Sequence, residues 1–82
     1  MSEAIDREEL RRDLADALSA IQKDHSVAGL DVLAEALTTL GEPYALHGRA
    51  MVKALEPVPR NYSALVWNLV RVLMLLEEEG KT

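Results

Sequence analysis

Two histidines, His25 and His47, are the side chains best suited to chemistry, because an imidazole can bind a metal ion or move a proton near pH 7. Neither belongs to an H-x-x-x-H or E-x-x-H pair, the spacings that place two metal ligands on one helical face. The chain contains no cysteine, which removes thiolate metal sites, cysteine nucleophiles and disulfides. We therefore predict no metal site and no cofactor, and we interpret His25 as a loop histidine.

The segments around His47 and Ser26 each match a known functional pattern only in part. The segment LHGRAMVK carries His47, Gly48 and Lys53, but in phosphotransfer helices lysine and glycine follow three and four residues after the histidine, and that spacing is absent. DHSVAGLDVLAEAL is similar to the serine signature of acyl carrier proteins only faintly, since a histidine separates its aspartate from Ser26. G-x-S-x-G, P-loop and dinucleotide-binding glycine patterns are also missing. The sequence predicts no enzyme and no small-molecule substrate.

The composition is that of an acidic helical protein. The chain has 82 residues, a net charge of −5 and an apolar fraction of 49%, with no phenylalanine. Leucine, alanine and valine dominate, which favours helices over sheets. The acidic balance argues against nucleic-acid binding, because most of that affinity comes from neutralising phosphates. MSEAIDREEL lacks the basic-then-apolar pattern of a secretory signal, so we expect a cytoplasmic location.

Capping and helix-breaking residues along the chain predict four helices, over about 7–23, 26–40, 43–56 and 62–79. Asp6 followed by Glu9 forms a capping box for the first, and Asn61 can cap the fourth. Gly41 and Pro43 separate the second from the third, and the PVP segment at 57–59 ends the third. We predict a single all-α domain over 1–82, a compact bundle with antiparallel or orthogonal helices.

Gly48 lies in the middle of the third predicted helix. A glycine there costs about 1 kcal/mol relative to alanine. We interpret it as a point where two helices approach closely.

The fourth helix, within NYSALVWNLVRVLMLLEEEG, is apolar on nearly every side. Between Ala64 and Leu76 only Asn68 and Arg71 are polar. The apolar arc spans roughly 220°, about twice an ordinary surface stripe. The run of about 13 residues is too short for a bilayer, which needs about 20, so we predict no membrane span. The solvent-facing side is expected at Ala64, Asn68, Arg71 and Glu78.

Two interpretations explain the excess apolar surface. In the first, the helix is central and ringed by the other three. In the second, its second face binds a protein partner or another copy of the chain. The two overlap, because one arc can be core and the other contact. In the second case the chain is a non-catalytic interaction module, an adaptor or a regulator that self-associates through this helix. The predicted interaction residues are Trp67, Val70, Met74, Leu75, Asn68 and Arg71. A weaker acidic dock is predicted at Glu77, Glu78 and Glu79.

Two alternatives stay open. The first is a helix-turn-helix regulator that binds DNA through the 43–56 helix, using Arg49, Lys53 and Arg60, although Glu42 and His47 stand where that motif needs apolar residues. The second is an inhibitor that binds an enzyme or effector.

The segment NYSALVWNLV, residues 61–70, resembles the last-helix segment of some bacterial death-like effector-associated domains. These are helical adaptors of about this length. The resemblance implies partner recruitment through like-with-like contacts. It covers about ten residues and consists mainly of a hydrophobic pattern, and the helix here extends about one turn further before its glycine.

Overall fold

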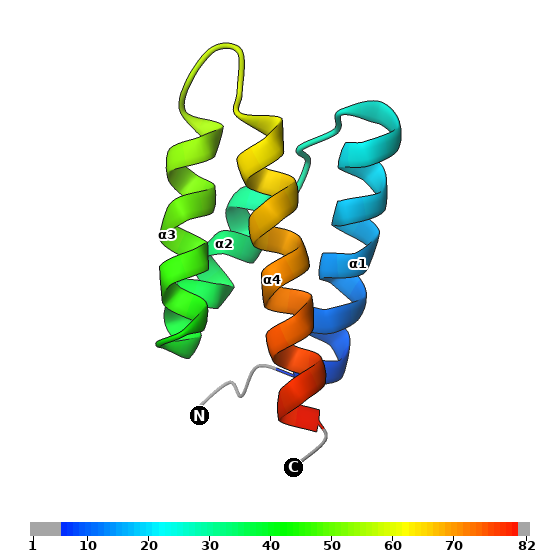
Figure 1. The fold of residues 1–82 in the computed structure, drawn as a ribbon, viewed down its shortest axis with the longest axis vertical. Helices are drawn as coiled ribbons and strands as arrows, with labels where there is room; N and C mark the ends of the chain where they lie inside the picture. The colour runs from blue at the N-terminus through cyan, green and yellow to red at the C-terminus, as the bar shows by residue number, and fades with distance from the viewer. Residues whose placement is uncertain (1–5, 81–82) are drawn as a thin grey trace.

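The computed structural model describes residues 6–80, which form four helices: α1 (Arg7–Asp24), α2 (Leu30–Leu40), α3 (Tyr44–Leu55) and α4 (Tyr62–Gly80). The helices run alternately up and down, and α2 lies obliquely behind the other three (Figure 1). The predicted all-α bundle of four helices is confirmed, in its antiparallel form. Within residues 6–80, no helix is long and apolar enough to cross a membrane.

Two predicted caps start α1 and α4. The Asp6 carboxylate accepts hydrogen bonds from the backbone N–H of Glu8 at 2.9 Å and of Glu9 at 3.4 Å. The Asn61 side-chain oxygen accepts from the backbone N–H of Ala64 at 3.1 Å. Each cap satisfies N–H groups that the first turn of a helix leaves without a partner. Both helices therefore begin where the sequence places them.

The second helix begins four residues later than predicted. We expected it from residue 26, but Ser26 accepts a hydrogen bond from the backbone N–H of Ala28 at 3.4 Å and forms a turn. Gly29 then adopts a φ of 79°, and the helix starts at Leu30. A left-handed residue cannot continue a right-handed helix, and serine readily stabilises turns of this kind. The loop between α1 and α2 is correspondingly longer.

Gly48 is the point where α3 meets α2. A Cβ atom on this glycine would lie 2.6 Å from the carbonyl oxygen of Ala34 and 3.1 Å from the Cβ of Leu37. Only a residue without a side chain allows this approach, so the close contact predicted for Gly48 is confirmed. Ala34 is fully buried at this contact.

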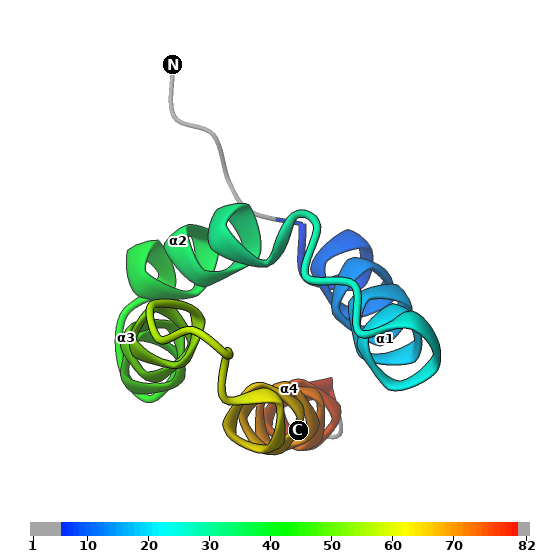
Figure 2. The same ribbon diagram turned by 90° about the horizontal axis from the view of Figure 1, so that it is seen from above.

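The fourth helix is not central. It packs against α1 and α3, and no Cα atom of α4 lies within 8 Å of one in α2. Figure 2, seen from above, shows the four helices around a common centre with α4 as one wall. The interpretation of α4 as a helix ringed by the other three is therefore wrong. Each helix contributes to one core, whose largest fully buried side chains are Leu14, Ile21, Leu30, Leu37, Met51, Leu65, Leu69 and Val72.

Candidate interaction surface

The side of α4 that faces away from the core carries large apolar side chains. Trp67 is 57% exposed, Met74 51% and Val70 37%. Their spacing of three and four residues places them in one stripe along the helix, which we call the α4 ridge. An exposed, contiguous apolar stripe on a helix is typical of a binding surface. We define the outer face of α4 as Ser63, Trp67, Val70, Arg71, Met74 and Glu78, all exposed, and the exposed Glu77 lies at its α1 edge.

Two neighbouring side chains support the Trp67 ring. The His47 ring, from α3, lies 6.0 Å away between centroids with an interplanar angle of 48°. The Arg71 guanidinium carbon lies 5.4 Å from the Trp67 ring centroid, in cation–π range. These contacts restrict the rotamers of Trp67 before any partner arrives. A pre-positioned aromatic side chain loses less conformational entropy on binding than a mobile one.

Asn68 is buried, contrary to the prediction that it faces solvent. It is only 5% exposed. Its amide nitrogen donates to the backbone oxygen of Ala64 at 2.8 Å, and its amide oxygen lies 2.8 Å from Nδ1 of His47. Because an amide oxygen can only accept, the His47 Nδ1–H is the donor in this second bond. Asn68 thus ties α4 to α3 and is not available to a partner.

The reason for this error is the direction from which α3 approaches. The sequence shows Ala64, Asn68, Arg71 and Glu78 as the least apolar side of α4, but α3 packs against Asn68 through His47, and Ala64 is half-buried. The side of α4 that faces solvent is therefore centred on Trp67 and Met74. The predicted interaction residues Trp67, Val70, Arg71 and Met74 are accessible, and Asn68 is not.

Shallow grooves border the α4 ridge on both sides. Between α3 and α4, a groove of about 390 Å³ is lined by residues that include Pro43, His47 and Leu75. Leu75 is half-buried and packs against the core, so only its edge is available. Between α1 and α4, another groove is lined by residues that include Ala15 and Leu18. Both grooves adjoin the ridge, because Met74 lines each of them.

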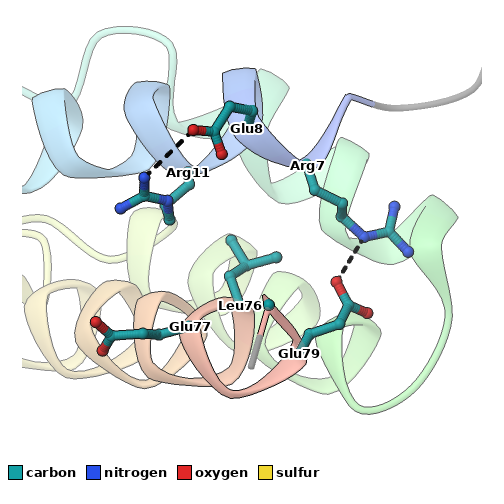
Figure 3. A pocket seen from close by; sticks show the side chains of 7 residues that line it. Arg7, Glu8, Arg11, Leu76, Glu77 and Glu79 are labelled. Carbon is teal, nitrogen blue, oxygen red and sulfur yellow. Dashed lines mark hydrogen bonds and ion pairs between the residues drawn. The ribbon is translucent and has the colours of Figure 1, made fainter. Parts of the chain in front are cut away.

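The acidic end of α4 is partly occupied by contacts within the chain. Glu79 forms an ion pair with Arg7 of α1, with 3.0 Å between Oε1 and Nε (Figure 3). Burial raises the pKa of the Tyr44 phenol, and the neighbouring Glu79 carboxylate raises it further. Glu77 lies on the α1 side of α4 and Glu78 on its outer face. Of the three residues in the predicted acidic dock, Glu79 is paired with the start of α1, whereas Glu77 and Glu78 are exposed.

The residues of the DNA-binding alternative do not form a basic surface. Arg49 is paired with Glu42, with 2.8 Å between Nη2 and Oε2. The Arg49 hydrogen bond lowers the pKa of the Glu42 carboxyl. Lys53 is exposed on α3, whereas Arg60 is exposed in the connector before α4. Nothing in this arrangement concentrates positive charge as phosphate binding requires.

The three residues considered for a phosphotransfer site lie in three different environments. His47 is half-buried and bonded to Asn68, Gly48 is buried against α2, and Lys53 is exposed. Within residues 6–80, no three histidine, aspartate or glutamate side chains lie close enough together to hold a metal ion.

Comparison with protein-family models, curated proteins and solved structures found no match. The resemblance of residues 61–70 to death-like effector-associated domains thus has no support beyond those residues.

Proposed function

We propose that the protein is a non-catalytic interaction module that self-associates through the α4 ridge. One observation carries the proposal: Trp67, Val70 and Met74 are 57%, 37% and 51% exposed in one line on the outside of the bundle. Covering an exposed tryptophan ring is worth on the order of 2–3 kcal/mol. Tryptophan and methionine are also enriched at the centres of interfaces. An adaptor or regulator in the cytoplasm is the role that we assign to it.

The charge distribution supports a protein partner over a nucleic acid. The net charge is −5, and Arg49 is already neutralised by Glu42. The outer face of α4 carries one cation, Arg71, and one anion, Glu78, beside the apolar ridge. Such a surface, with an apolar centre and a few charges at its edges, can exclude wrong partners through its charges.

The test is the molecular mass in solution as a function of concentration. We expect a monomer–dimer equilibrium in sedimentation or light scattering, and Trp67→Ala should raise the dissociation constant about tenfold or more. Val32→Ala is the matched control, because Val32 is 65% exposed but lies on α2, away from the ridge. A chain that stays monomeric at the highest attainable concentration would contradict the proposal, as would an equal loss on Val32→Ala.

A further inference from the structure

We infer that the partner of the α4 ridge is the α4 ridge of a second copy of this chain, with the two helices antiparallel. The two-fold axis passes between Val70 and Arg71. This inference rests on the proposed function and adds to it the orientation and the residue pairs. It follows from the order of side chains on the outer face of α4.

That order is self-complementary on reversal. The exposed residues of the outer face map onto one another about the midpoint of Val70 and Arg71. Trp67 then meets Met74 of the second copy, and Ser63 meets Glu78. A two-fold interface uses the same patch on both subunits, so the patch has to be complementary to itself. The six outer-face residues satisfy this condition, and the exposed Glu77 at the α1 edge lies opposite the half-buried Ala64 of the second copy.

The central pairs match in chemistry as well as in position. The thioether of Met74 is flexible and makes favourable contacts with aromatic rings, so it suits the exposed ring of Trp67. Val70 of one copy meets the aliphatic stem of Arg71 of the other. Within each copy, the Arg71 guanidinium already lies 5.4 Å from the Trp67 ring centroid. The arginine can therefore cover valine with its methylene groups while its charge stays at the wet edge.

The ends of the helix also complement each other in this orientation. Glu77 and Glu78 lie at the C-terminal end of α4, where the helix dipole disfavours negative charge. In the antiparallel pair they lie beside the N-terminal end of the second α4, which carries partial positive charge and follows the exposed Arg60. Neither Glu78 nor Arg60 is in an ion pair among residues 6–80. Association gives Glu78 an opposite charge that the isolated chain does not provide.

The parallel alternative reverses every one of these contacts. It would place Glu78 on Glu78 and Arg71 on Arg71, and it would gather both acidic ends at one side. Each copy already has a net charge of −5, so an orientation that concentrates this charge raises the cost of association. Like charges at contact distance therefore disfavour the parallel orientation.

The size of the surface indicates a dimer of moderate affinity. Nineteen residues make α4 about 28 Å long, and a stable interface buries roughly 600 Å² or more per partner. The ridge alone provides less than that. The flanking grooves, with Leu18 on one side and Pro43 on the other, have to contribute as well. We therefore expect a dissociation constant on the order of micromolar.

Cysteine pairs test the orientation, because the natural chain has no cysteine. Ser63→Cys and Glu78→Cys are prepared as separate full-length variants and are oxidised alone and mixed in a glutathione buffer. In the antiparallel dimer the two copies of position 63 lie about 22 Å apart, beyond the Cα separation that a disulfide spans. We expect the mixed dimer to form much faster than either self-dimer. The masses of the products distinguish them.

Each other outcome overturns a stated part of the inference. Rapid self-linking of Ser63→Cys would show a parallel pair and would overturn the orientation while leaving self-association intact. A dimer in which neither position links would place the interface elsewhere and would overturn the inference together with its basis. A natural chain that stays monomeric in light scattering would contradict the proposed function itself.

A charge exchange gives an independent readout. Arg60→Glu and Glu78→Arg should each raise the dissociation constant about three- to tenfold, and the double variant should recover most of the affinity. Lys53→Glu is the control for a change of charge away from the ridge. Failure of the double variant to recover would overturn the end-to-end contact.

Discussion

The inner and outer faces of α4 both carry large apolar side chains, but their environments are opposite. Leu69 is fully buried, and its neighbour in sequence, Val70, is 37% exposed. The inner face packs into the core with side chains from α1 and α3, whereas the outer face is touched only at its edges, as by the His47 ring beside Trp67. Apolar content alone thus does not say which face of a helix is core. The position of the neighbouring helices decides it, and the face left over becomes the candidate for binding.

The sharpest test of this contrast compares Leu69→Ala with Val70→Ala. Removing the fully buried Leu69 side chain leaves a cavity, and we expect the free energy of unfolding to fall by about 2–5 kcal/mol. Val70→Ala should change it by about 0.5 kcal/mol or less in the monomer. Urea unfolding at low protein concentration measures both. Similar losses for the two variants would erase the distinction between the faces.

A second pair of neighbours, Gly48 and Arg49, extends the contrast to α3. In Gly48→Ala the new Cβ would meet the backbone oxygen of Ala34 at 2.6 Å, so α2 and α3 would have to separate. We expect a loss of about 1–3 kcal/mol, larger than the gain in helix propensity. Arg49→Ala, on the exposed side, should cost much less, since a surface ion pair is worth about 0–1 kcal/mol. If Gly48→Ala proved stabilising in thermal unfolding, the close approach would be refuted.

The polar contact between α3 and α4 gives a smaller effect. His47→Ala and Asn68→Ala each remove one partner of the 2.8 Å hydrogen bond. A double-mutant cycle should give a coupling energy of about 0.5–1.5 kcal/mol. Ser63→Ala, on the outer face, is the control and should not couple to His47. A coupling near zero would mean that the bond adds nothing to the packing of these two helices.

The smallest effect is expected at the end of α4, in the response to alkaline pH. The pKa of Tyr44 is raised above its ordinary value of 10.0 by burial and by Glu79, so the folded state favours the neutral phenol. This contribution to stability is fully present below pH 10 and is lost as the pH rises through the raised pKa. Tyr44→Phe should flatten the alkaline loss of stability relative to the natural chain. Denaturant unfolding between pH 9 and pH 11 measures the difference; equal slopes would contradict it.

Much of the fold could be predicted because its signals are local. Asp6 and Asn61 bond to N–H groups two or three residues away, and Gly48 marks a place where only a bare backbone fits. The start of α2 was missed because Ser26 can serve as a helix cap or close a turn with the same hydroxyl. Gly29, with its positive φ, was the signal that could have distinguished the two.

Most residues of the candidate site could be predicted from the sequence, but the side of α4 that faces solvent could not. Trp67, Val70, Arg71 and Met74 were identified as interaction residues, and all are accessible. Asn68 was assigned to the same surface and is buried. The support that His47 gives to Trp67 joins two helices and leaves no mark at any fixed spacing in the sequence.

The sequence by itself determined that the chain forms helices, where most of them begin and end, and that α4 has more apolar surface than one core can cover. These properties depend on caps, periodicity and composition, which act over a few residues. Only the tertiary structure decided which part of α4 faces solvent. That choice depends on the side from which α1 and α3 pack, because burial is a property of the neighbours of a side chain and not of the side chain alone.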